Sequence, residues 1–321
     1  MSIDASIVPL SASAAGEPTV SVVVPVYNSE ATLTELVMRL TAVLDRVARA
    51  HEVILVDDGS SDGSWSVILQ LEQQFGTRGL RLMRNYGQHN ALLAGIRAAS
   101  YDVIVTLDDD LQNPPEEIPA LLEGLTGGYR VVYGTPRKGQ YAPGRGVATL
   151  ITKMVVRHLL GFSAIKTISS FRAFHTELRD AFASYEGSFV SIDILLTWGT
   201  TRFGAVAVDH HPRAVGKSQY SYGRLIRHTI DMISSFSERP LQFASFLGLS
   251  AVVFGIAVLC YALGHFIFSP HTVEGFTFLA SIIAIFAGIQ LFVQGITGEY
   301  VSRIHFRVMD KPTYVLWSRK E

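Results

Sequence analysis

Two long apolar segments near the C-terminus constrain the fold more than any other feature of the sequence. They are Leu241–Phe268 and Gly275–Thr297, and neither contains a lysine or an arginine. Each exceeds the roughly 20 residues that a helix needs to cross a bilayer. The alternative is a buried helical hairpin in a soluble protein, but such lengths without Lys or Arg disfavour it. The sequence therefore predicts a transmembrane hairpin over about residues 241–298.

The charges that flank these segments predict their orientation. Lys and Arg residues close to transmembrane segments are retained on the cytoplasmic side. The stretch Ser269–Glu274 between the segments has none, whereas both outer flanks are basic: Arg224, Arg227, Arg239, Arg303, Arg307 and Lys311. We therefore expect a multi-pass protein of the cell inner (plasma) membrane, with both termini and the bulk of the chain in the cytoplasm. Residues 222–240 fit an amphipathic helix lying along the bilayer, and residues 299–321 a cytoplasmic tail.

The composition of the 321-residue chain agrees with attachment to a membrane. Its hydrophobic content of 48%, charged content of 17% and mean hydropathy of +0.28 are unusual for a soluble protein. The net charge of −1 gives no reason to expect nucleic acid as a partner. Cys260 is the single cysteine, so one chain offers neither a disulfide nor a cysteine-based zinc site. Residues 1–18 lack the pattern of a signal peptide and are expected to form a disordered tail.

Residues 19–221 alternate between apolar runs typical of buried strands and amphipathic helical patterns. This alternation predicts an α/β domain built on a doubly wound, mostly parallel sheet. The expected strands are Val20–Val26, Glu52–Val56, Leu80–Met83, the run that begins at Val103, Arg130–Tyr133 and Phe203–Val208. The expected helices are about Glu30–Arg49, His89–Ala99, Pro114–Leu122 and Val147–Leu160, with further helices up to Trp198.

Acidic residues follow two of the expected strands. Asp57 and Asp58 come directly after Glu52–Val56, and the run VIVTLDDDLQ at Val103–Gln112 ends in three carboxylates and an amide. The carboxyl ends of parallel strands meet at one edge of a sheet, and ligands bind at that edge in folds of this class. We therefore expect both acidic clusters to lie at one ligand-binding edge.

The second acidic cluster predicts a metal site. If the strand continued through it, its period of two would point Asp108, Asp110 and Gln112 one way and Asp109 the other. Two carboxylates and an amide oxygen suit Mg²⁺ or Mn²⁺. The alternative is a solvated acidic turn before Pro114, but the preceding run is too apolar for a surface loop.

Two basic loops complete the expected site. Arg137–Gly146 (RKGQYAPGRG) and His211–Tyr222 (HPRAVGKSQYSY) carry several cations. Each is either a solvated connection or a segment that contacts phosphate groups. The GKS at residues 216–218 does not make a P-loop, because His211 stands where that pattern requires glycine. No G-x-G-x-x-G follows the first strand, which argues against a dinucleotide fold.

Four motifs stand out along the chain: PVYN at 25–28, VDDGSSDG at 56–63, RNYGQHNALLAG at 84–95 and LDDDLQNPPEEIP at 107–119. Together they resemble family 2 glycosyltransferases of the GT-A fold. Within that family the chain resembles the polyprenyl-phosphate branch, which includes dolichyl-phosphate mannose synthases. It looks most like the bacterial undecaprenyl-phosphate 4-deoxy-4-formamido-arabinose transferases, and the resemblance covers about residues 20–310.

The resemblance implies a role for each residue that matches a family motif. It implies a nucleotide-sugar donor, for which UDP is favoured, held by Pro25, Tyr27, Asp57, Asp58, Arg84, Gln88 and Asp109. It implies a catalytic divalent metal, Mg²⁺ or Mn²⁺, on Asp108, Asp110 and Gln112. It implies contacts to the acceptor phosphate or the donor diphosphate from Arg137, Arg145, Arg213 and Lys217. The acceptor would be a polyprenyl (undecaprenyl) phosphate in the lipid bilayer, the transfer would invert the anomeric carbon, and the enzyme could be a homo-oligomer.

The chain departs from the family pattern at two places. The family commonly has Glu directly after the Tyr-Asn pair, whereas here Ser29 intervenes before Glu30. It often has Lys after the Gly-x-Ser of the last loop, whereas here that residue is Gln219 and the nearest cation is Lys217. The residue that supplies each missing charge is left open.

The chemistry sets limits on the catalytic groups. A phosphate acceptor is already an anion, so transfer to it requires no strong general base. Asp193 is a candidate base, although a lone acid on a helix is more often solvated. A processive polysaccharide synthase is an alternative, but it would need more spans and a Gln-x-x-Arg-Trp motif, which is absent. A non-catalytic membrane scaffold is another, but it would not need the carboxylates together with the loop arginines.

Overall fold

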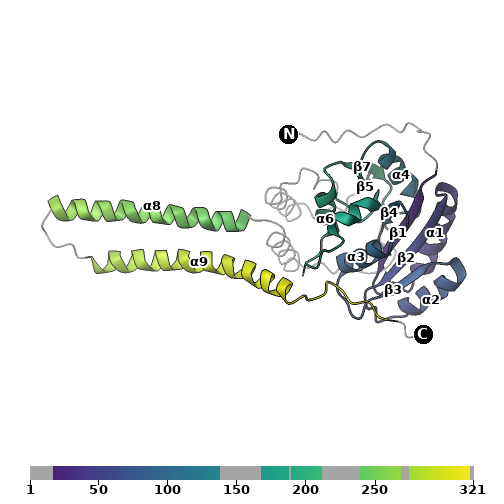
Figure 1. The fold of residues 1–321 in the computed structure, drawn as a ribbon, viewed down its shortest axis with the longest axis horizontal. Coiled ribbons are helices and arrows are strands. Elements are labelled where there is room, and N and C mark those ends of the chain that lie inside the picture. The colour runs from purple at the N-terminus through teal and green to yellow at the C-terminus, as the bar shows by residue number, and fades with distance from the viewer. Residues whose placement is uncertain (1–16, 138–167, 188, 212–238, 269–274, 319–321) are drawn as a thin grey trace. The chain divides into compact units, whose positions relative to one another are not determined.

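The computed structural model describes residues 17–137, 168–187, 189–211, 239–268 and 275–318 (Figure 1). These residues fall into two compact units. The first contains the described residues up to His211 together with those from Pro312 onward, and the second contains Arg239–Lys311. Each unit is described by itself.

The first unit is built on a mixed, mostly parallel sheet. Within the described ranges the sheet has seven strands in the order β3-β2-β1-β4-β6-β5-β7. The pairs β1–β2, β1–β4, β2–β3 and β5–β7 are parallel, and β6 is antiparallel to both of its neighbours. The strands are β1 Thr19–Val26, β2 Ala50–Asp57, β3 Arg78–Arg81, β4 Val103–Thr106, β5 Val131–Pro136, β6 Arg172–His175 and β7 Phe203–Val208.

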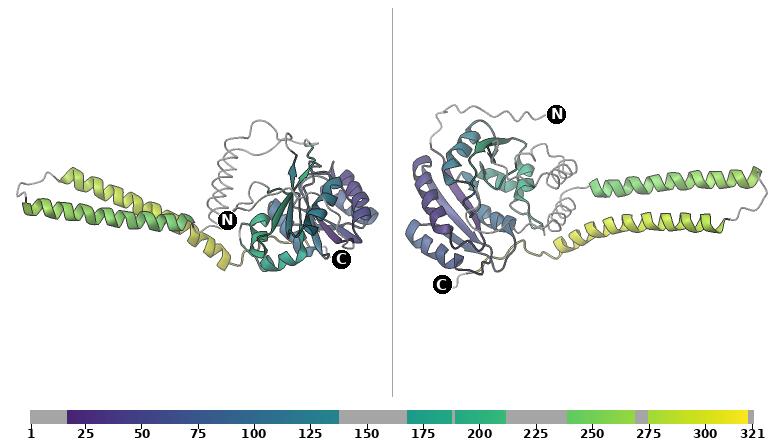
Figure 2. Two further views of the ribbon diagram at one scale, coloured as in Figure 1. Left: turned by 90° about the horizontal axis from the view of Figure 1, so that it is seen from above. Right: turned by 180° about the vertical axis from the view of Figure 1, so that it is seen from behind.

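Helices cover both faces of this sheet (Figures 1 and 2). They are α1 Leu33–Val47, α2 Ser64–Phe75, α3 Gln88–Ala98, α4 Ile118–Thr126 and α6 Ile192–Gly199, with 3₁₀ turns η1 Pro115–Glu117 and η3 Thr176–Phe182. The even-numbered valines of β1 share one apolar core with α1, α2 and α4. Val23 points to the other face, where a Cβ on Gly95 of α3 would lie 2.3 Å from its Cγ1. Because glycine has no Cβ, α3 approaches the sheet closely.

The first strand and the first helix confirm the sequence patterns. Every residue of β1 is buried, as expected for a strand covered on both faces. In α1 the buried positions are the predicted apolar face: Leu33, Leu36, Val37, Leu40, Val43 and Leu44. The α/β class and the mostly parallel sheet are therefore confirmed.

Several boundaries differ from the prediction. Strand β3 begins at Arg78 and ends at Arg81, two residues before the expected Leu80–Met83. The expected helix Pro114–Leu122 begins with a 3₁₀ turn and continues to Thr126. The expected helix Val147–Leu160 lies outside the described residues.

The second unit contains two long helices that lie side by side, α8 Arg239–Phe268 and α9 Phe276–Val308 (Figure 1). The rings of Phe254 and Phe286 have their centroids 6.4 Å apart. Many large apolar side chains of α8 face outward, among them Phe246 at 68% and Leu249 at 64% exposure. Exposed apolar surface on this scale is typical of a region that contacts a lipid or protein partner.

Among the described residues, one helix is long and apolar enough to cross a membrane by length and composition alone. It spans Arg239–Tyr261 within α8, with a mean hydropathy of 2.4. Helix α9 continues past the expected Thr297 to Val308 and contains the Glu299–Arg303 ion pair, 2.7 Å long. The two-helix transmembrane hairpin therefore stays a prediction.

Candidate functional site

The carboxyl ends of β1, β2 and β4 meet at one edge of the sheet. Val26 at the end of β1 lies opposite Asp57 at the end of β2, and Val23 lies opposite Thr106 at the end of β4. The loops that follow these strands carry most of the predicted donor and metal residues.

Hydrogen bonds join the three loops to one another. The Asn28 backbone N–H donates to Ser60 Oγ over 3.0 Å, which links the β1 loop to the β2 loop. The Tyr27 N–H donates to Asp109 Oδ2 over 3.2 Å, and Thr32 Oγ1 donates to the Asp109 carbonyl over 2.7 Å. Asp109 therefore holds the β1 loop against the β4 loop. Its predicted contact with the donor stays a prediction.

Asp57 and Asp58 are both buried at the end of β2. Asp57 Oδ1 accepts a hydrogen bond from the Ser60 N–H over 2.9 Å, and its Oδ2 lies 3.2 Å from Arg81 Nε. Asp58 accepts hydrogen bonds from the backbone N–H groups of Tyr86 and Gly87, at 2.7 and 2.8 Å. Burial raises the pKa of Asp58 to about 6, against the lowering effect of these two hydrogen bonds. Asp58 thus anchors the segment that leads into α3.

Gly59 permits the β2 loop to reach this position. Its φ is +70°, and a Cβ there would lie 2.6 Å from the backbone carbon of Arg84. Any other residue would therefore combine an unfavourable conformation with a backbone clash. Because residue 59 is glycine, the loop after β2 can contact the loop after β3 at this edge.

The acidic run after β4 is a loop and not a continued strand. Strand β4 ends at Thr106, and Leu111 has a φ of +58°. The alternation of side chains along a strand therefore does not apply beyond Thr106. It gives no reason for Asp109 to point away from Asp108 and Asp110. A positive φ at a non-glycine residue is uncommon and is typical of functional loops. The loop is held by a bond from the Gln112 N–H to Asp110 Oδ1, 3.1 Å long.

Asp108 is partly buried, and both of its oxygens accept hydrogen bonds. Gln88 Nε2 donates to Oδ1 over 2.5 Å, and Ser170 Oγ donates to Oδ2 over 2.6 Å. Loss of solvent raises the pKa of Asp108 to about 6. The Ser170 hydrogen bond opposes this shift, and the negative charges of Asp110 and Asp109 add to it. Gln88, a predicted donor residue, thus contacts a predicted metal ligand.

An ion pair between a buried arginine and a partly buried aspartate lies at the end of β4. Arg172 of β6 is 1% exposed and pairs with Asp193 of α6. Arg172 Nε donates to Thr106 Oγ1 over 3.0 Å, and the Tyr133 hydroxyl donates to Asp193 Oδ1 over 3.0 Å. Asp193 is therefore the counter-ion of a buried arginine, an arrangement that does not favour its interpretation as a free catalytic base.

The remaining predicted donor residues differ in their exposure. Pro25 is buried within β1, whereas Tyr27 is 49% exposed at the edge. Arg84 is exposed, and its guanidinium lies 4.2 Å from the centre of the Tyr86 ring. Glu30 Oε2 accepts a hydrogen bond from the Gly63 N–H over 2.9 Å, at the N-terminus of α2. Glu30 therefore holds the β2 loop.

The predicted basic residues are only partly described. Arg137, just after β5, lies 3.3 Å from Asp209 Oδ1 through its Nε and 3.8 Å from Glu117 Oε1 through its Nη2. Arg145, Arg213 and Lys217 lie outside the described residues. The second basic loop nevertheless begins beside the acidic loop, because the His211 N–H donates to the Gln112 carbonyl over 2.9 Å.

The sequence did not indicate Ser170, Arg172 or Arg81 as members of this region. Ser170 and Arg172 reach it because β6 pairs with β4 from more than sixty residues away in the chain. No motif or spacing signals such a contact.

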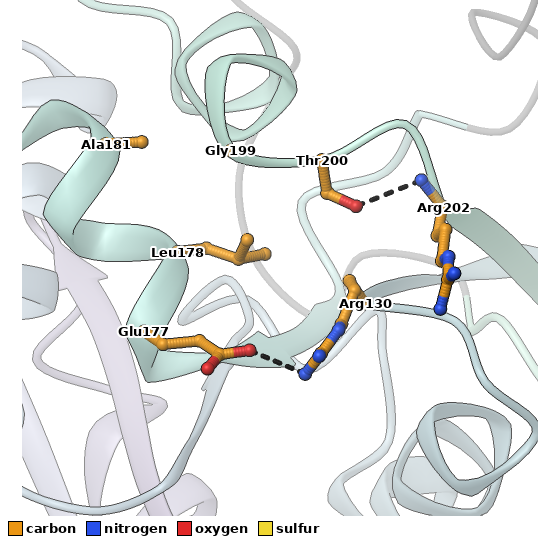
Figure 3. A pocket seen from close by; sticks show the side chains of 7 residues that line it. All are labelled: Arg130, Glu177, Leu178, Ala181, Gly199, Thr200 and Arg202. Atoms are coloured by element: carbon orange, nitrogen blue, oxygen red, sulfur yellow. Dashed lines mark hydrogen bonds and ion pairs between the residues drawn. The ribbon is translucent and has the colours of Figure 1, made fainter.

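A hollow of about 480 Å³ lies at the opposite edge of the sheet and does not belong to this site (Figure 3). Arg130 precedes β5, Arg202 precedes β7, and Glu177 follows the antiparallel β6. Arg130 and Glu177 form an ion pair 2.5 Å long.

Comparison with known proteins agrees with the fold. The first unit combines a mixed, mostly parallel sheet with carboxylates at its carboxyl edge, and its fold is of the GT-A class. Residues 21–185 match the model of the family described as glycosyl transferase family 2. The chain belongs to this family and is a glycosyltransferase.

One relative is similar over almost the whole chain. It is the undecaprenyl-phosphate 4-deoxy-4-formamido-L-arabinose transferase of Aeromonas hydrophila subsp. hydrophila, 35% identical over 301 residues that cover 92% of each chain.

Solved structures support the fold alone. Glucosyl-3-phosphoglycerate synthase from Mycobacterium tuberculosis, in complex with Mn²⁺, uridine diphosphate and glucosyl-3-phosphoglycerate, has a TM-score of 0.52 at 21% identity. The match covers 68% of this chain and 80% of that one. The same enzyme with Mg²⁺ and uridine diphosphate has a TM-score of 0.50 at 20% identity, covering 68% and 77%.

Proposed function

We propose that this enzyme transfers a sugar from a nucleotide-sugar, with UDP favoured, to a polyprenyl phosphate at the cytoplasmic face of a membrane. The observation that carries the proposal is the 35% identity, over 92% of both chains, to a relative whose name specifies undecaprenyl phosphate. This match extends over the sheet unit and most of the apolar helices. The outward-facing apolar side chains of α8 support a lipid environment.

The acidic loop fits a divalent metal ion. The negative charge of Asp110 lies close enough to Asp108 to raise the pKa of the Asp108 carboxyl. Each Asp108 oxygen accepts one hydrogen bond, which leaves a lone pair on each for a cation. No group of three acidic, histidine or cysteine side chains in the described part of the chain could hold a metal. The proposed set of Asp108, Asp110 and Gln112 is instead two carboxylates and an amide, with the diphosphate as a further source of oxygens.

The residues of the edge would each perform a separate task in transfer. When bound, the divalent cation supplies positive charge that stabilises the leaving diphosphate. The exposed Tyr27 ring would contact the nucleotide, whereas the buried Asp57, together with Asp58 and Asp109, would keep the loops around it in place. The loop that begins at His211 would bring arginine to the acceptor phosphate, with paired donors that match phosphate oxygens. The acceptor is already an anion, so no general base is assigned.

Arg213→Ala tests the acceptor half of the proposal. Arg213 follows His211, whose backbone contacts Gln112, by two residues. Loss of one charge-assisted hydrogen bond, worth roughly 1.5–3 kcal/mol, should lower transfer to undecaprenyl phosphate about ten- to a hundredfold. Calorimetry without lipid should show unchanged affinity for the nucleotide-sugar. Arg213→Lys, which keeps the charge, should retain part of the activity. An equal loss of donor affinity would instead assign Arg213 to the diphosphate.

Cysteine labelling tests the predicted membrane topology. Ser269–Glu274 carries no Lys or Arg, which places it outside the cytoplasm in the proposal. Thr272→Cys, with Cys260 replaced by alanine, should react with a membrane-impermeant thiol reagent added to intact cells. Ser318→Cys, close to the C-terminus in the same background, serves as the control and should react only after lysis. Reaction of Thr272→Cys only after lysis would show that the loop is cytoplasmic and the topology wrong.

A further inference from the structure

The described C-terminal segment Pro312–Trp317 adds a strand-like element to the edge of the sheet. It covers β3, whose outer side would otherwise lack a partner in the sheet order. The Met83 N–H donates to the Val315 carbonyl over 2.9 Å, and the Trp317 N–H donates to the Arg81 carbonyl over 2.7 Å. Leu82 and Leu316 form an antiparallel bridge between these two bonds. The segment therefore belongs to the sheet unit, although only Met309–Lys311 separate it from α9.

Trp317 places an aromatic face against Arg81. The Arg81 guanidinium carbon lies 5.8 Å from the centre of the Trp317 ring and 5.4 Å from that of Trp65 in α2. The two indoles are 6.3 Å apart and nearly perpendicular, at 79°. Cations attract the faces of tryptophan rings within about 6 Å. Arg81 thus contacts two indoles, one of which the C-terminal segment provides.

Arg81 in turn contacts the buried acid of the proposed nucleotide site. Arg81 Nε lies 3.2 Å from Asp57 Oδ2, and Asp57 is 0% exposed. That oxygen accepts no hydrogen bond from the residues the structure describes. Leaving a buried carboxylate without its cation destabilises the folded state. Arg81 therefore stabilises the Asp57 carboxylate in its buried position.

We propose that Trp317 and Arg81 are positioning residues for the nucleotide. Trp317, together with Trp65, fixes the Arg81 guanidinium, and Arg81 fixes the Asp57 carboxylate at the carboxyl edge. The C-terminal segment is then a part of the donor site that the chain supplies after α9. Asp57 acts through the β2 loop, because its Oδ1 accepts the Ser60 N–H. This inference rests on the proposed function, because it takes the edge formed by that loop as the nucleotide site.

Nucleotide titration of the full-length protein in detergent tests this assignment. The probes are UDP and GDP with MnCl₂, measured by calorimetry, with the nucleotide that the wild type binds more tightly used for the variants. Trp317→Ala should weaken binding about three- to tenfold, as expected for loss of one partly buried cation–π contact. Trp317→Phe, which keeps an aromatic face, should restore most of the affinity. Leu316→Ala, at a neighbouring side chain that is 44% exposed, is the matched control and should bind as the wild type does.

Thermal melting separates positioning from a purely structural role. The melting temperature of Trp317→Ala should stay within about two degrees of the wild type. If Trp317→Ala does not fold, Arg81→Lys takes its place, because it keeps a positive charge but loses the planar group that contacts both indoles. Wild-type affinity in the variant tested would overturn this inference but not the proposed function. So would a loss of affinity that Trp317→Phe does not restore, or one that accompanies a larger fall in melting temperature, which would indicate a purely structural role. A wild type that binds neither nucleotide would overturn the proposed function as well.

Discussion

Asp110→Asn is expected to lower the rate of sugar transfer on the order of a thousandfold, while the protein still folds. Asp110 belongs to the loop after β4, and its charge acts on Asp108. Replacing a carboxylate ligand by an amide removes part of the charge that holds a divalent cation at the leaving diphosphate. The side chain keeps its size, and its amide oxygen can still accept the Gln112 N–H, so the loop conformation should persist.

The measurement for this variant is turnover at saturating Mn²⁺ and donor, together with the melting temperature. Asp180→Asn is the matched control, because Asp180 is an exposed carboxylate of η3 outside the acidic loop. It should leave both quantities unchanged. Turnover of Asp110→Asn close to wild type with saturating metal would refute the assignment of Asp110 as a metal ligand.

Arg172→Met is expected to destabilise the sheet unit by about 3–5 kcal/mol, because it leaves the partly buried Asp193 carboxylate without its cation. Arg172 is 1% exposed, and it also donates to Thr106 at the end of β4. The expected fall in melting temperature is on the order of ten degrees. Thermal unfolding followed by tryptophan fluorescence would measure it.

Two companion variants give this experiment its controls. Arg172→Met combined with Asp193→Leu replaces the buried pair by apolar side chains and should recover much of the lost stability. Arg130→Met removes the partner of an exposed acid, Glu177 at 61% side-chain exposure, and should cost less than about 1 kcal/mol. Melting of Arg172→Met within about two degrees of wild type would show that the buried pair does not support the site.

The sequence predicted those parts of the fold that depend on local patterns. Continuous apolar runs located β1 and β2, and the helical period of apolar residues identified the buried face of α1. Parallel strands deliver their carboxyl ends to one edge, so the meeting of the β2 and β4 loops also followed from the sequence.

The remaining features depend on contacts between distant residues. Strand β6 joins β4 as an antiparallel neighbour and places Ser170 against Asp108, which no local pattern signals. The segment Pro312–Trp317 was taken for part of a tail because its pairing with β3 adds only a few bonds to a short, unpatterned stretch. Strand periodicity failed at Leu111, where the chain adopts a positive φ.

Product analysis tests the central proposal most directly. The purified full-length enzyme would be incubated with Mn²⁺, undecaprenyl phosphate and, one at a time, a panel of UDP- and GDP-sugars, and the lipids examined by mass spectrometry. Undecaprenol without the phosphate is the matched acceptor control. The proposal predicts a single sugar added to undecaprenyl phosphate, most strongly from a UDP-sugar, and no product from undecaprenol. Formation of a polysaccharide, or sugar transfer to undecaprenol as efficient as to its phosphate, would contradict it.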